Sequence, residues 1–257
     1  MTTRNTEHLA ATVAEHIEAD AVFQGMYWDE EAQKGCFIGC LVHGNKPHLI
    51  EERYGIPVMI TKIAEAIFER LPADEAKQFF ADFPAAIGND GKDLSRVGWQ
   101  FLAQTLRDLP PITAEVQAVI DPVIAGLDRL AKGEEWPRAA AAAATRAAAR
   151  AANAATWNAD VAAANAATRA ANAAACDADV AAANAAARAA DAAACDADAD
   201  AAAWAAARAV DARLAWAAAA AWAAAAGWAA DGAAKAGAWT AAIRQQRDLL
   251  LRLIREA

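Results

Sequence analysis

The 257-residue chain has few of the side chains on which nucleophilic enzymes and disulfide scaffolds depend. Ser95 is its single serine, and the place of this serine two residues after Asp93 suits helix capping better than catalysis. The motifs G-x-S-x-G and G-x-G-x-x-G and the P-loop do not occur. Four cysteines are too few for a disulfide framework in a chain of this length. We therefore expect a non-enzymatic protein in a reducing, cytoplasmic compartment.

β-branched residues are scarce after residue 138, where alanine predominates. This scarcity argues against a sheet in the second half of the chain. A methyl group buries little apolar area, and burial contributes roughly 25 cal/mol per Å². The alanine-rich half must therefore depend on backbone helicity and close packing. We predict an all-α protein, built as a multi-helix bundle.

The acidic excess is confined to the first half of the chain. Residues 1–138 contain 13 Lys and Arg against 22 Asp and Glu, whereas residues 139–257 contain 11 of each. A nucleic-acid interface needs a basic stripe, so we expect no nucleic-acid partner. The longest uncharged run, residues 214–230, has 17 residues and is mostly alanine. It lies at the lower limit of a membrane span and alanine contributes little to insertion, so we expect no membrane segment.

The spacing of apolar residues predicts two units. Residues 1–136 form a front subdomain of short amphipathic helices, and residues 137–257 form an alanine-rich helical bundle. Pro84 and Pro122 fall inside predicted helices and are expected to interrupt or kink them. Residues 24–44 are predicted to be irregular. The predicted front helices cover residues 6–21, 57–71, 73–86, 95–106 and 113–132.

The alanine-rich region contains an internal repeat of 19 residues over 158–176, 177–195 and 196–214. Two arrangements fit this repeat. One is a long helical rod in a homo-oligomer. The other, which we favour, is a set of helices of about 15 residues, each capped by an aspartate of the N/D-A-D sequence. The second arrangement keeps the polar residues of each helix on one side.

Tryptophans mark the end of the alanine-rich region. Trp204, Trp216, Trp222 and Trp228 are 12, 6 and 6 residues apart, a spacing that points them to three sides of a helix. A helix with large apolar groups on all sides is buried on all sides, so residues 214–226 are predicted to be central in the bundle. Residues 239–256 are predicted to form a final amphipathic helix.

A candidate metal site lies in the irregular segment. Cys36, Cys40, His43 and His48 fall within 13 residues and could bind zinc tetrahedrally. The alternative is that Gly35-Cys36 and Gly39-Cys40 are small residues that allow a close backbone approach.

Aromatic and basic residues offer a second candidate site. Tyr27 and Trp28 could stack on the base of a small ligand, and Arg169 and Arg188 could pair with its phosphate. The alternative is that the aromatic residues belong to the core and the arginines pair with repeat aspartates such as Asp191.

A set of front-segment motifs resembles an uncharacterised family of phage and bacterial proteins. The motifs are QGxYW at residues 24–28, KGCFIGC at 34–40, GIP at 55–57 and IFExLP at 67–72. The resemblance covers about residues 24–109 and implies a helical, phage-borne protein, with no activity to transfer. The tail has a weaker likeness to alanine-rich immunity proteins.

Three hypotheses follow from the sequence. The first is a non-enzymatic binding protein of a phage or mobile element, which acts in host–phage conflict through a protein partner or a small ligand. The second is a zinc-binding protein that uses the Cys-Cys-His-His set. The third is a structural, oligomeric helical rod.

Overall fold

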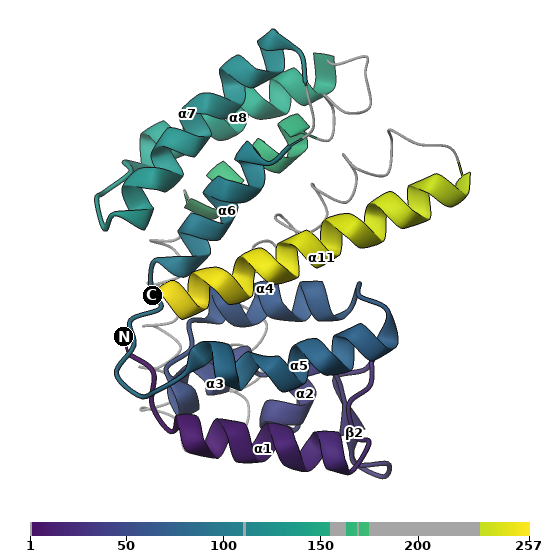
Figure 1. Cartoon of the computed structure of the whole chain (residues 1–257). Helices are drawn as coiled ribbons and strands as arrows, with labels where there is room; N and C mark the ends of the chain where they lie inside the picture. Colours follow the sequence, from purple (N-terminus) through teal and green to yellow (C-terminus); the bar gives the residue numbers. More distant parts are fainter. Residues whose placement is uncertain (1, 110–111, 155–162, 169, 175–231) are drawn as a thin grey trace, which may run out of the picture.

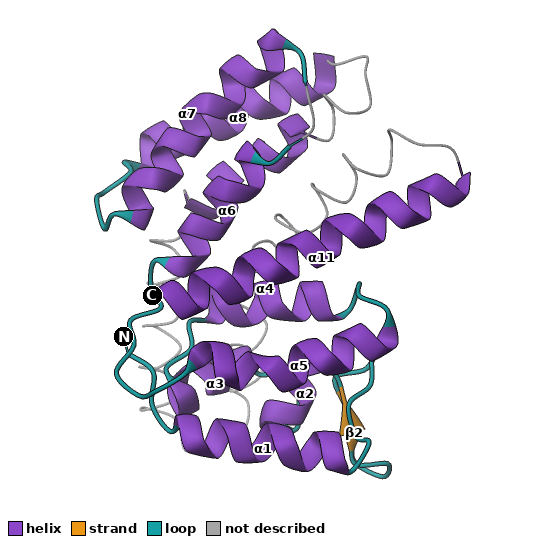
Figure 2. Cartoon of the chain, in the orientation of Figure 1, coloured by secondary structure: helices purple, strands orange, loops and turns teal. Residues whose placement is uncertain are grey.

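The fold is all-α, as predicted (Figures 1 and 2). The computed structural model describes residues 2–109, 112–154, 163–168, 170–174 and 232–257. The only paired strands of these ranges are β1 (Trp28–Asp29) and β2 (Lys34–Gly35), which form a short antiparallel hairpin. The helices are α1 (Thr6–Glu18), α2 (Phe37–Val42), α3 (Pro47–Tyr54), α4 (Val58–Phe68), α5 (Ala73–Ile87), α6 (Val97–Arg107), α7 (Ala114–Ala131), α8 (Arg138–Ala154) and α11 (Gly232–Glu256).

The core of the front helices is aromatic. Phe37, at the start of α2, is fully buried, and its ring centroid lies 5.0 to 6.1 Å from four other phenylalanine rings. Three of these rings follow one face of α5, and their mostly edge-to-face geometry is the arrangement that aromatic quadrupoles prefer. The four rings belong to Phe68, Phe79, Phe80 and Phe83.

The expectation that Pro84 and Pro122 interrupt their helices is wrong, because α5 and α7 continue through them. Each proline removes one backbone donor. Buried side chains on both sides of each proline, such as Phe83 and Ile87 in α5, hold the flanking turns in the core. Tertiary packing therefore outweighs the local preference.

The prediction that residues 24–44 are irregular is wrong in part, because they include β1, β2 and α2. This segment also contains a close backbone approach. The amide of Cys36 donates to the carbonyl oxygens of Met26, at 2.8 Å, and Tyr27, at 3.2 Å. A Cβ atom at Gly35 or Gly39 would overlap the Tyr27 carbonyl oxygen. The prediction that these glycines permit a close backbone approach is therefore confirmed.

The C-terminal helix joins the front helices, although the sequence division placed it with the alanine-rich unit. α11 contacts α4 and α5 on one side and α6 on the other (Figure 1). Its Ile243, Leu250 and Ile254 are fully buried, which confirms the predicted amphipathic helix. The Lys92 ammonium donates to the Ile254 carbonyl at 2.8 Å and so satisfies a backbone acceptor at the end of this helix.

The described alanine-rich residues are helical and pack closely. α8 lies beside α7, and the helical residues 163–168 and 170–174 contain alanines with no exposed surface, such as Ala163 and Ala167. Most of the 19-residue repeat, the four tryptophans and the predicted central helix over 214–226 lie outside the described residues. Within the described part, no helix combines the length and apolar character needed to cross a membrane.

The close approach at Gly39 leads to a first prediction. We expect Gly39→Ala to lower the free energy of unfolding by more than about 2 kcal/mol, because its methyl group would overlap the Tyr27 carbonyl. Gly44→Ala is the matched control, since a Cβ there meets no atom within 4 Å. Urea unfolding of both variants measures the effect. Equal stability of the two variants would contradict the packing described for Tyr27.

Candidate functional site

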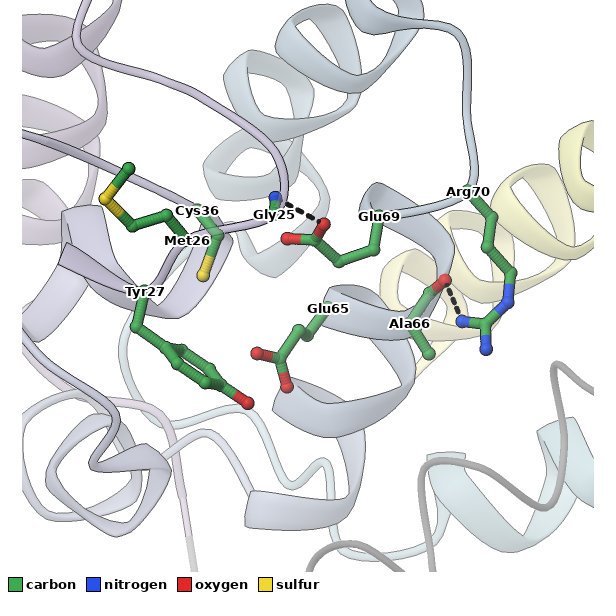
Figure 3. A pocket seen from close by; sticks show the side chains of 8 residues that line it. All are labelled: Gly25, Met26, Tyr27, Cys36, Glu65, Ala66, Glu69 and Arg70. Atoms are coloured by element: carbon green, nitrogen blue, oxygen red, sulfur yellow. Dashed lines mark hydrogen bonds between the residues drawn. The ribbon is translucent and has the colours of Figure 1, made fainter.

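A pocket of ≈ 470 Å³ lies between the chain before β1 and the C-terminal end of α4 (Figure 3). We call it the Tyr27 pocket. One wall comes from the loop and the start of α2, and the other from α4 and the two residues that follow it. Its lining residues are Gly25, Met26, Tyr27, Cys36, Glu65, Ala66, Glu69 and Arg70.

The rim of the Tyr27 pocket exposes large apolar side chains. Met26 is 44% exposed and Tyr27 is 40% exposed, whereas Phe23, which is 59% exposed, does not line the pocket. The described residues contain no other exposed large hydrophobic side chain. A cluster of such side chains beside a pocket is typical of a binding surface.

Lys62 and Glu65 form a buried ion pair at the pocket wall. The Lys62 ammonium donates to Glu65 Oε2 at 3.1 Å, and the two side chains are only 8% and 11% exposed. The same ammonium lies 5.9 Å from the centroid of the Tyr27 ring, and the Tyr27 hydroxyl hydrogen-bonds to Glu65. Burial raises the pKa of Glu65, although Lys62 and Tyr27 oppose the rise.

A second carboxylate, that of Glu69, holds the loop. Its Oε2 accepts the Gly25 amide at 2.8 Å (Figure 3). Burial raises the pKa of Glu69, and the neighbouring charge of Glu65 adds to the rise. The Gln24 side-chain amide fixes the same loop by donating to the carbonyls of Phe68, at 2.6 Å, and Leu71, at 2.9 Å.

Arg70 brings a partly desolvated cation to the pocket. Its Nη1 donates to the Ala66 carbonyl at 2.6 Å, and burial lowers the pKa of the guanidinium. The site therefore combines two carboxylates, an arginine and an exposed tyrosine face. Such a set can hold a ligand by charge-assisted hydrogen bonds and aromatic contact.

The two cysteines of this region are unreactive thiols. Burial raises the pKa of both Cys36 and Cys40 to about 12, so neither is a thiolate near neutral pH. The Cys40 Sγ donates to the Gly35 carbonyl at 3.2 Å and helps to fix the hairpin. Cys36 thus contributes a small apolar surface to the pocket.

The ligand-binding residues predicted from the sequence are only partly brought together. Tyr27 lines the pocket, whereas Trp28 packs against His43 and His16. Arg169 and Arg188 lie outside the described residues. The sequence prediction missed Glu65, Glu69 and Arg70. Charged residues within the apolar pattern of α4 were the available signal, because Glu65 and Glu69 share one helix face.

The four predicted zinc ligands do not form one ligand set in the structure. Within the described ranges, no three His, Cys, Asp or Glu side chains are arranged to hold a metal ion. Cys36 and Cys40 are buried, and Cys40 bonds to backbone carbonyls. His48 lies on α3, whereas His43 faces His16 of α1. The spacing of residues 36–48 could not show that His43 contacts His16, because His16 is 27 residues away from His43 in the sequence.

His16, Trp28 and His43 form an aromatic–histidine cluster. Trp28 and His43 stack with their centroids 4.1 Å apart and an interplanar angle of 10°. The Nε2 atoms of His16 and His43 are 3.4 Å apart. His43 has a φ of 51° at the C-terminal end of α2, a left-handed conformation that turns the chain there.

In comparisons with known proteins, no family model matches the chain, and neither a curated protein nor a solved structure matches it.

The raised pKa of Glu69 gives a pH-dependent prediction. The pKa of the Glu69 carboxyl group is higher in the folded chain than its ordinary value of 4.5, which we take for the unfolded chain. Such a group destabilises the fold increasingly as the pH rises above 4.5. Glu69→Gln removes this penalty and keeps an acceptor for Gly25. The variant should therefore become more stable than the original chain as pH rises from 4.5 towards neutral, and the gain should vanish below 4.5.

Chemical unfolding across this pH range measures the difference between the two proteins. Glu52→Gln, at an exposed position on α3, is the matched control for the loss of one negative charge. A Glu69→Gln variant that loses stability relative to the original chain as pH rises would show that the fold favours the ionised carboxylate, contrary to this prediction.

Proposed function

We propose that this protein is a non-enzymatic binding protein that takes a small ligand in the Tyr27 pocket. The observation that carries the proposal is the combination of an exposed Met26–Tyr27 rim with two partly desolvated carboxylates below it. Large exposed apolar groups and perturbed carboxyl groups both favour a functional site over a purely structural one. The high pKa of the Cys36 thiol argues against nucleophilic catalysis by that residue.

The chemistry of the pocket favours a small compound with a cationic amine or guanidinium group. Glu65 is paired with Lys62, but its charge still acts on Glu69, and a cation beside Glu69 would offset that repulsion. The Tyr27 face already lies near the ammonium of Lys62, an arrangement that a cationic ligand could extend. Met26 would cover an apolar part of the same compound.

The setting of this function is also part of the proposal. The front-segment motifs favour a protein of a phage or mobile element, in which capture of a host small molecule would serve counter-defence or immunity. Cys36 and Cys40 are free thiols, which is consistent with action in the cytoplasm.

Mass spectrometry of small molecules that copurify with the native chain tests the proposal. We expect a cationic compound to copurify with the original protein, and its affinity to fall about tenfold in Tyr27→Ala because the aromatic face is lost. Phe23→Ala is the matched control, since it removes an exposed ring that does not line the pocket. It should retain the compound. If no small molecule distinguishes Tyr27→Ala from the original protein, the proposal is wrong.

A further inference from the structure

We infer that His16 and His43 form a binding site for a transition-metal ion such as Zn²⁺, with solvent supplying the remaining ligands. This site is separate from the Tyr27 pocket and does not depend on the function proposed for that pocket. It also differs from the Cys36, Cys40, His43 and His48 set expected from the sequence, with which it shares only His43.

The separation of the two imidazoles fits one metal ion. Their Nε2 atoms are 3.4 Å apart. Two nitrogens that are each 2.0–2.1 Å from a tetrahedral Zn²⁺ are separated by roughly 3.3–3.4 Å. A small rotation of the rings would therefore allow both nitrogens to bind one ion without moving α1 and α2 apart.

The tautomer of His16 is the one that a metal ligand needs. Its Nδ1 lies 2.8 Å from the Thr12 carbonyl oxygen, which can only accept a hydrogen bond. Nδ1 therefore carries the proton, and Nε2 presents a lone pair towards His43. Donation of the second ring nitrogen to a backbone carbonyl is the usual way in which proteins orient a histidine ligand.

His43 is held from the other side by Trp28. Their stacking at 4.1 Å fixes the plane of the imidazole, and the exposed position of His43 leaves a path for an ion from solvent.

The charges around His43 are of both signs. Glu30, on the hairpin, and Glu15, on α1, act on His43 as nearby negative charges, whereas Arg53 of α3 opposes them. No group of three protein ligands is in place within the described residues. The inference is therefore of a two-histidine site, open to water or to an incoming ligand.

Calorimetric titration of the full chain with Zn²⁺ near neutral pH tests the inference. We expect one saturable site per chain. His16→Gln and His43→Asn should each weaken Zn²⁺ binding at least about tenfold, since even residues behind a ligand commonly contribute that much. Asn suits the left-handed backbone at residue 43. His48→Gln is the matched control and should leave the affinity unchanged.

A second measurement does not depend on the variants' folding. NMR of the histidine ring nitrogens of the original chain should show that Zn²⁺ shifts the resonances of His16 and His43 and leaves those of His8 and His48 in place. Three results would overturn the inference: absence of saturable Zn²⁺ binding, unchanged affinity in a folded His16→Gln, or a loss in His48→Gln equal to that in His43→Asn. The last result would assign the ion to the ligand set expected from the sequence.

Discussion

The seating of the Tyr27 carbonyl against Gly35 and Gly39 is the contact on which both sites depend. It requires two positions without a Cβ atom, and the Cys36 amide holds the carbonyl there. Tyr27 lies immediately before β1, which begins at Trp28. Fixing this peptide therefore directs Tyr27 to the pocket beside α4 and Trp28 to the histidines of α1 and α2.

The pocket in turn depends on charges buried in an otherwise apolar helix. Lys62 and Glu65 neutralise one another on α4, and removal of one partner from such a buried pair typically costs about 3–5 kcal/mol. Glu69 and Gln24 then fasten the loop over the end of the helix. A protein that needed only stability could fill these positions with apolar residues, and the binding function proposed above would account for their charges.

Most helices of the front subdomain could be predicted because their apolar periodicity is local, whereas the short helix α2 was not predicted. Examples are the buried Val97, Phe101 and Leu102 of α6 and the C-terminal amphipathic helix. The continuation of α5 past Pro84 could not be predicted in this way, because it depends on the burial of Phe83 and Ile87 in the core formed with other helices. The sites could be predicted only in part. Tyr27 stands out as the first of two adjacent aromatic residues, whereas the approach of His16 to His43 depends on how α1 packs on α2.

Amide hydrogen exchange at Cys36, measured by NMR, tests the central claim most directly. If its amide is held by the Met26 and Tyr27 carbonyls in a buried backbone contact, it should exchange about as slowly as the amide of Ile63 in the middle of α4. Exchange as fast as that of the exposed Gln33 in the hairpin turn would mean that the contact opens freely. In that case the Tyr27 carbonyl could not position either site.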